Sequence, residues 1–412
     1  MECWKPSWCS IKKPSTPGLI IVIPCHDEPD IITTLDSLAA CYKPESPVLV
    51  SVVVNAAKDA PASVVRQNQT TIADSKNWLA KNLNPDLTVS ILDHQDLEPK
   101  HAGVGLARKI GMDAAAYLYK DLGYDNGPIV CLDSDCTVEK NYLQTLIAHF
   151  KNHQKTPGCS INFAHPLDGL TPQHRYGIAA YELYLRYYRQ GLRWSGHPAA
   201  YHTVGSSMAV RADIYLSQGG MNRRKAGEDF YFLQKIIALG GFTEIMDTQV
   251  NPSPRRSLRV PFGTGRAMEE WLQGEEGTWL TYDPKVFQDL HSFFRNSQRF
   301  FAEPVVLESP VLEEYLDQAG FIAAMDKIRS NTTTAQTCQK KFFHWFNPFR
   351  VLKFIHYATS HHYAKIPLEE ASKTVWGWLG GKGQGGSDIE QWLISYRNFE
   401  KNHGVHADKP PQ

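Results

Sequence analysis

The stretch Ile129-Val130-Cys131-Leu132-Asp133-Ser134-Asp135 is the best guide to this chain, because an apolar run ends abruptly in two carboxylates. Such a pattern predicts a buried strand with a charged end. In an open α/β sheet, ligands bind beyond the carboxyl ends of the strands. Two aspartates placed there can hold a divalent cation, and oxygen donors favour Mg²⁺ or Mn²⁺. The alternative is that Asp133 and Asp135 only cap a helix that begins near Val138.

The segments before this stretch alternate between strand and helix patterns. Continuous β-branched or apolar runs predict strands at 19–23, ending at Pro24, at 48–54 and at 87–92. Apolar residues recur at helical spacing behind Asp30, over about 61–83 and over 103–119. This βαβα alternation predicts an α/β fold, with a mostly parallel sheet and helices on both faces.

The regular alternation of strand and helix patterns ends after Pro157. We expect a strand at 159–163, an aromatic-rich helix at 177–188, a short strand at 206–211 and a helix from 226 to 239. Asp229 lies in the first turn of that last helix, where the helix dipole favours an ionised carboxylate. From Ala267 onward the chain becomes aromatic and helical. With a boundary near Met268, we expect an α/β domain at 1–267 and a mainly helical region at 268–412.

The composition argues against several classes of protein. Lys+Arg and Asp+Glu both number 43, so the chain lacks the basic excess typical of nucleic-acid binding. Its eight cysteines form no CxxC pair and are interpreted as reduced, mostly buried thiols. The N-terminal residues lack a signal-peptide pattern, and no run of about 18 apolar residues occurs. We therefore expect a cytoplasmic protein.

The stretch 340–357 mixes cations with aromatic residues and could lie on the inner face of a membrane. Asn347-Pro348 interrupts it, which favours an ordinary helical core instead. The glycine-rich run at 380–386 is interpreted as a flexible connector. A peripheral membrane contact and an oligomer contact both remain open for the C-terminal region.

Four groups of residues form an ordered series along the chain. They are Ile21-Val22-Ile23-Pro24-Cys25-His26-Asp27-Glu28, then Gly103-Val104-Gly105-Leu106-Ala107-Arg108, then Asp133-Ser134-Asp135, and finally Gly205-Ser206-Ser207-Met208-Ala209 with Gly227-Glu228-Asp229. In that order and at those separations they resemble the family 2 glycosyltransferases of the GT-A fold. The resemblance covers about residues 19–240.

The resemblance implies transfer of a sugar from a nucleoside diphosphate sugar to an acceptor hydroxyl, with inversion at the anomeric carbon. It implies that Asp135 binds the metal directly, and that Asp133 faces the ribose or reaches the ion through water. A metal held there would neutralise the leaving diphosphate. Asp229 matches the general base. Its neighbour Glu228 is the second candidate, and adjacent helical residues point about 100° apart.

The resemblance also implies a set of nucleotide-binding residues. Glu28 matches an acidic residue that contacts the nucleoside, with Asp27 where asparagine is usual. Asn55 stands where relatives have adjacent aspartates, and it could still read a pyrimidine or a guanine edge. Arg108 matches an arginine that approaches the base or the diphosphate. The same nucleotide-sugar site is predicted to include Pro24, His26 and Ser134.

The downstream loop leaves further alternatives open. No histidine occurs between His202 and His291 to supply a third metal ligand, so water and diphosphate would complete the shell. Arg255 and Arg256 either clamp the diphosphate or lie on a solvated loop. His197 and His202, just before the acceptor-side strand, are either structural or touch the acceptor.

Two rival functions compete with glycosyl transfer. A sugar-phosphate nucleotidyltransferase needs a basic glycine-rich loop after its first strand, where this chain has carboxylates. A non-catalytic nucleotide-sugar or glycan binding module would not need the acidic residues Glu28, Asp133, Asp135 and Asp229, which are all present. The pattern Gly103-x-Gly105-x-x-Arg108 lacks the third glycine of a dinucleotide fingerprint. The acceptor, whether glycan, lipid-linked or small molecule, stays open.

Overall fold

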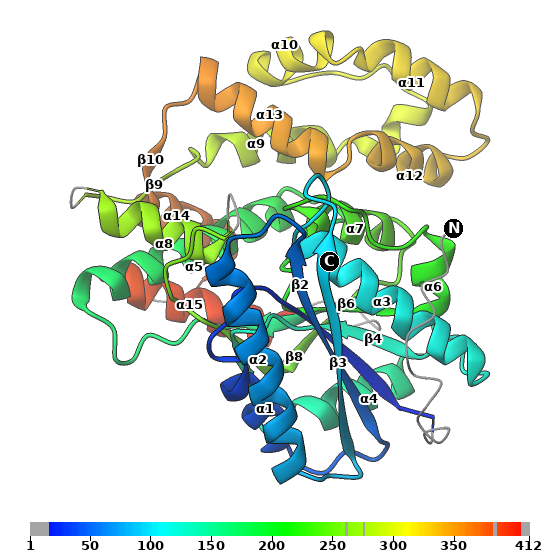
Figure 1. Ribbon diagram of the computed structural model, residues 1–412. Coiled ribbons are helices and arrows are strands. Elements are labelled where there is room, and N and C mark those ends of the chain that lie inside the picture. Colours follow the sequence, from blue (N-terminus) through cyan, green and yellow to red (C-terminus); the bar gives the residue numbers. More distant parts are fainter. Residues whose placement is uncertain (1–15, 260–262, 275–276, 382–384, 405–412) are drawn as a thin grey trace. The chain divides into compact units, whose positions relative to one another are not determined.

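The computed structural model describes residues 16–259, 263–274, 277–381 and 385–404 (Figure 1). Within this part of the chain, two compact units separate. The first unit contains residues 16–166, 203–269 and 400–404. The second contains residues 167–202 and 270–399, so the segment at 167–202 groups with the C-terminal region rather than with the expected 1–267 domain.

The first unit is built on an eight-stranded sheet in the order β3-β2-β1-β4-β7-β6-β8-β5. Its strands are β1 (Leu19–Cys25), β2 (Val48–Ala57), β3 (Leu87–Leu97), β4 (Pro128–Cys131), β5 (Cys136–Val138), β6 (Gly158–Phe163), β7 (Met208–Arg211) and β8 (Thr243–Pro252). The pairs among β1, β2, β3 and β4 are parallel, as is the pair of β6 with β8. The predicted α/β fold with a mostly parallel sheet is therefore confirmed, although β7 runs antiparallel to both neighbours.

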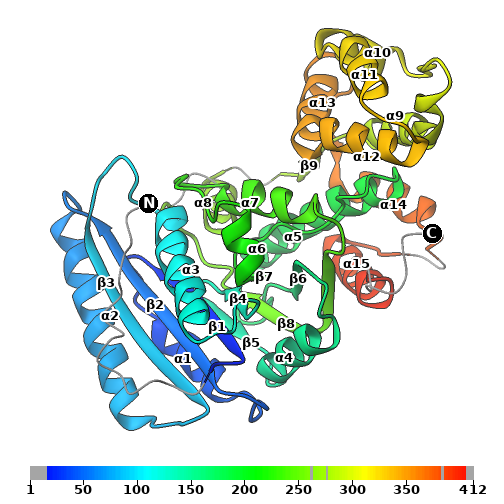
Figure 2. The same ribbon diagram turned by 90° about the vertical axis from the view of Figure 1, so that its right-hand side faces the viewer.

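Helices cover both faces of this sheet (Figure 2). They are α1 (Ile31–Ala39), α2 (Ala62–Lys81), α3 (Val104–Asp121), α4 (Tyr142–Asn152), α6 (Ala212–Ser217) and α7 (Glu228–Ile237), followed by α8 (Thr264–Gln273), which spans the division between the units. On one face, α3 packs closely on β1 and β2, since a Cβ at Gly111 would meet Val22 and Val53. On the other, α1 and α2 join through the Trp78 indole N–H, which donates to Asp36 at 2.6 Å.

Two sequence expectations need correction. The first strand does not end at Pro24 but continues to Cys25, because the φ angle of proline is compatible with extended backbone. The helix expected near Val138 is instead the short strand β5, which pairs antiparallel with β8. The helix α4 begins only at Tyr142. Asp133 and Asp135 therefore do not cap it, and that alternative is excluded.

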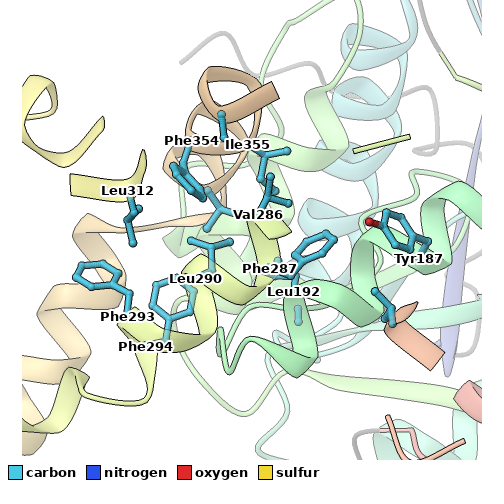
Figure 3. Close-up of a cluster of buried hydrophobic side chains, with 14 of the residues drawn as sticks. Tyr187, Leu192, Val286, Phe287, Leu290, Phe293, Phe294, Leu312, Phe354 and Ile355 are labelled. Atoms are coloured by element: carbon cyan, nitrogen blue, oxygen red, sulfur yellow. The ribbon is translucent and has the colours of Figure 1, made fainter. Parts of the chain in front are cut away.

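The second unit is mainly helical, as expected. Its elements are α5 (Pro172–Trp194), β9 (Leu280–Thr281), α9 (Lys285–Phe294), the 3-10 helix η2 (Ser297–Phe301), α10 (Pro310–Gln318), α11 (Phe321–Ser330), α12 (Ala335–Trp345), α13 (Pro348–His361), β10 (Ile366–Pro367), α14 (Leu368–Trp378) and α15 (Ile389–Asn402). Figure 3 shows its core, where Tyr187 and Leu192 of α5 lie in one cluster with side chains of α9, α10 and α13.

The stretch 340–357 contributes to this core. Phe342, Phe354 and Ile355 are fully buried in the cluster. Asn347 lies between α12 and α13 and caps α13, because its side-chain oxygen accepts from the backbone N–H groups of Phe349 and Arg350. The helical-core interpretation is confirmed. In the glycine-rich run, residues 382–384 lie outside the described residues. No described helix is long and apolar enough to cross a membrane.

Candidate active site

The carboxyl ends of three neighbouring strands meet at one edge of the sheet in the first unit. β1 lies between β2 and β4 and is parallel to both. Residues 26–28 follow β1, Asn55 lies near the end of β2, and residues 133–135 follow β4. The sheet thus brings together polar groups that are far apart in the sequence.

Backbone conformation and hydrogen bonds position the end of β1. Asp27 has a positive φ of 51°, a region that aspartate and asparagine tolerate better than most residues. Its N–H donates to the Asn68 side chain at 2.9 Å. The Asn55 side-chain nitrogen donates to the Cys25 carbonyl at 3.0 Å, and a His26 ring nitrogen contacts the Asn55 carbonyl at 2.8 Å. Part of the Asn55 amide therefore ties β2 to β1, and its contact with a base stays a prediction.

Arg108 is the buried centre of the site. Its guanidinium group donates to Glu228 from one terminal nitrogen and to Asp133 from the other. Burial acts to lower the pKa of Arg108, but Asp133 and Glu228 outweigh it and leave the pKa well above its usual value. The side chain predicted to approach the base or diphosphate is thus bound to two carboxylates. Its contact with a donor stays a prediction.

Two glycines of the sequence motifs allow this arrangement. A Cβ at Gly205 would lie 2.5 Å from the Arg108 Nη1 atom and 2.6 Å from its Cζ atom. A Cβ at Gly105 would collide with the carbonyl of Arg224 in the segment that leads to α7. These glycines are needed for close approach, because any side chain there would displace the arginine or the loop.

The two candidate bases differ in their surroundings. Glu228 is buried and held by Arg108, so its carboxylate is already paired. Asp229 is half-buried, and its carboxylate accepts hydrogen bonds from the backbone N–H groups of Phe230, at 2.7 Å, and of Gly205. Burial raises the pKa of Asp229 above its ordinary value, while Arg108 opposes the rise. Burial raises the pKa of Glu228 as well, so the role of either residue as the base stays a prediction.

Asp133 and Asp135 both reach solvent from the strand end, with side chains 37% and 30% exposed. Burial, and after it the charge of Asp133, raises the pKa of Asp135 to about 6. Asp133 also raises the pKa of Asp229, so all three carboxyl groups share one electrostatic environment. Among the described residues, no group of three or more His, Cys, Asp or Glu side chains is arranged to hold a metal ion.

The loop after β8 brings two more arginines to the end of β1. Arg255 donates to one Glu28 carboxylate oxygen at 2.8 Å and to the other as well, and it lies 3.1 Å from Asp135. Arg259 lies 3.2 Å from Glu28 and donates to the His26 carbonyl at 2.8 Å. Burial acts to raise the pKa of Glu28, but the Arg255 hydrogen bond outweighs it and leaves the pKa lowered.

Arg256 and Ser134 were also predicted to bind the nucleotide sugar, and they lie in different surroundings. Arg256 extends the other way, toward Glu269 at 3.6 Å, and its contact with a donor stays a prediction. Ser134 is buried beside the site, and its carbonyl accepts from Thr34. Sequence reasoning missed Arg259. The available signal was a third arginine in the same proline-rich loop.

His197 lies in the second unit, where the structure describes it as a core residue. Its Nε2 contacts the Phe346 carbonyl at 2.9 Å, and its ring packs edge-on against Phe294 and Phe343. Burial lowers the pKa of His197 to about 4. The structural interpretation is therefore correct for His197. For His202, contact with an acceptor stays a prediction.

Comparisons with known proteins give structural likeness only. No protein-family model and no curated protein sequence matches the chain. Among solved structures, it is similar to S. aureus TarS 1-349, also solved in complex with UDP-GlcNAc, at 15% and 14% identity and a TM-score of 0.39. Both matches cover 93% of this chain and 92% of that one.

The chain is also similar to the mannosyltransferase PcManGT from Pyrobaculum calidifontis, solved in complex with GDP-Man and Mn²⁺. The identity is 13%, the coverage 96% of this chain and 91% of that one, and the TM-score 0.37. With TM-scores below 0.5, these likenesses by themselves assign no activity.

Proposed function

We propose that this chain is a metal-dependent, inverting glycosyltransferase that moves a sugar from a nucleoside diphosphate sugar to an acceptor hydroxyl. The observation that carries the proposal is the cluster of Asp133, Glu228 and Asp229 around Arg108, with Asp135 close enough to Asp133 for the charge of Asp133 to raise its pKa. These carboxyl groups come from a strand end and a helix start that are about a hundred residues apart in the sequence, as the ordered motifs require.

The charges of the cluster support a role for a divalent cation. The cluster contains five carboxylates and, in the described part of the chain, three guanidinium groups. The carboxylates are those of Glu28, Asp133, Asp135, Glu228 and Asp229, and the guanidinium groups are those of Arg108, Arg255 and Arg259. The cluster therefore has two excess negative charges when every group is ionised. A diphosphate adds further negative charge, so a cation is needed for both to coexist.

The residues at the strand end fit Mg²⁺ or Mn²⁺. Asp135 would hold the ion directly and Asp133 would help to position it, with diphosphate oxygens and water as the other ligands. When bound, the ion stabilises the negative charge that develops on the leaving diphosphate.

The protein's own residues supply the other requirements of transfer. Asp229 accepts the proton of the acceptor hydroxyl as that oxygen attacks the anomeric carbon. Arg108 binds Glu228 and Asp133, which fixes the start of α7 relative to the end of β4. It thereby holds the base at a constant distance from the donor phosphates. Because acceptor and leaving group occupy opposite faces of the sugar, the product has inverted configuration.

A donor screen tests the proposal. Purified protein with Mn²⁺ is incubated with UDP-, GDP- and dTDP-sugars, among them UDP-GlcNAc and GDP-mannose, without acceptor. We expect at least one donor to raise the unfolding temperature and to be hydrolysed slowly, and EDTA to remove both effects. If the wild type and Asp229→Asn both bind a donor and neither hydrolyses it, the result would favour a non-catalytic binding module. No stabilisation by any donor would refute the proposal.

A further inference from the structure

The loop that follows β8 contacts both carboxylates that a donor and its cation would need. Arg255 binds Glu28 through both terminal nitrogens and also lies 3.1 Å from Asp135. Glu28 follows β1 and Asp135 follows β4, so one guanidinium group joins two strand ends. Arg259 adds a second cation to Glu28, at 3.2 Å.

This pairing is required while no ligand is present. Glu28 is fully buried, and a buried carboxylate without a counter-ion is strongly destabilising. Asp135 is partly exposed and has a weaker need for Arg255. The contact with Asp135 is therefore the one that a ligand can replace most easily.

Arg255 also has unused binding capacity. Its Nε atom is buried and has no hydrogen-bond acceptor in the described part of the chain. A buried donor without an acceptor is unfavourable. A phosphate oxygen would satisfy it, because guanidinium groups bind phosphates through two adjacent N–H groups.

We propose that Arg255, assisted by Arg259, is an exchangeable latch on the donor site, an inference that rests on the proposed function. Without donor, Arg255 occupies Asp135 and competes with a divalent cation for it. When a nucleoside diphosphate binds, Arg255 moves from Asp135 to a phosphate and leaves that carboxylate to the cation. Metal and diphosphate then bind cooperatively, because each favours the same rearrangement.

The first arm of the test measures Mn²⁺ alone. Wild type and Arg255→Gln are titrated with Mn²⁺ at pH 8, and the free ion is followed by its electron paramagnetic resonance signal. We expect Arg255→Gln to bind Mn²⁺ about tenfold more tightly, since a competing cation has been removed. Arg66→Gln, an exposed arginine on α2, is the matched control and keeps the wild-type affinity.

The second arm measures UDP, GDP or dTDP, whichever stabilises the wild type, at saturating Mn²⁺. Here Arg255→Gln loses a phosphate contact, and we expect about tenfold weaker binding. The two arms thus change in opposite directions, which a general loss of structure cannot produce. A thermal unfolding curve verifies that each variant is folded.

A second variant keeps the test decisive if Arg255→Gln does not fold. Arg255→Lys retains a charge for Glu28 but cannot span both carboxylates, so Mn²⁺ binding tightens by a smaller factor. If every folded variant binds Mn²⁺ no more tightly than wild type, the latch is refuted while the proposed function stands. If no nucleotide binds the wild type, the proposed function fails, and the Mn²⁺ arm alone decides whether Arg255 competes with cations.

Discussion

Replacing Arg108 with glutamine removes the cation at the centre of the site. The ion pair with Glu228 is almost completely buried, with side chains 4% and 2% exposed. Removing one partner of a buried pair costs about 3–5 kcal/mol, because the other charge is left uncompensated. The contact with Asp133 adds little, since that carboxylate is 37% exposed and is screened by water.

The loss should be visible in thermal unfolding of the first unit. For a folded unit of this size, 1 kcal/mol corresponds to about 2–4 °C, so Arg108→Gln should unfold roughly 6–20 °C below wild type. The double variant Arg108→Gln/Glu228→Gln replaces the ion pair by two neutral amides and should recover part of that loss. Circular dichroism at pH 7.5 measures both, with Arg66→Gln as control.

Two results would refute this reasoning. If Arg108→Gln unfolds at the wild-type temperature, the buried pair does not stabilise the protein as described. If the double variant is less stable than the single variant, then Glu228 is not the group left uncompensated. The energetic coupling between the two residues, rather than either single effect, is the decisive quantity.

Three further predictions concern the same site. Gly205→Ala should lower donor turnover at least about tenfold by displacing Arg108, because small misplacements are costly in catalysis. The control is Gly377→Ala, where a Cβ meets nothing within 4 Å and no effect is expected. Equal effects of the two substitutions would contradict the prediction. Asp229→Asn should abolish transfer while leaving donor affinity near wild type in calorimetry, and parallel loss of both would mean that Asp229 is not the base. Folding raises the pKa of Asp135 from 3.8 to about 6, so this carboxyl group should lower the free energy of unfolding as the pH rises through that range. The affinity for Mn²⁺ should decrease when the pH is lowered below about 6, because the protonated carboxyl group no longer binds the ion. Asp135→Asn should remove both trends, and a profile unchanged from wild type would exclude this residue.

Local sequence pattern was sufficient to predict most of the sheet and the helical C-terminal region. β-branched runs at 19–23 and 48–54 can only be buried on both faces, so they identified central parallel strands. The pattern was insufficient to predict β5, because its three residues are too few to show the alternation of buried and exposed side chains that marks a strand. It also did not indicate that residues 167–202 group with the C-terminal helices, because that depends on which apolar surfaces meet in space.

The sequence by itself determined which chemistry is available here, namely aspartates placed after a buried strand and at the start of a helix, in the order of a known family. Only the tertiary structure decided how those groups are paired. Arg108 binds Glu228, and Arg255 and Arg259 bind Glu28 from more than two hundred residues away. Ion pairs of this kind depend on distance and burial in three dimensions, which residue types and spacing along a chain do not specify.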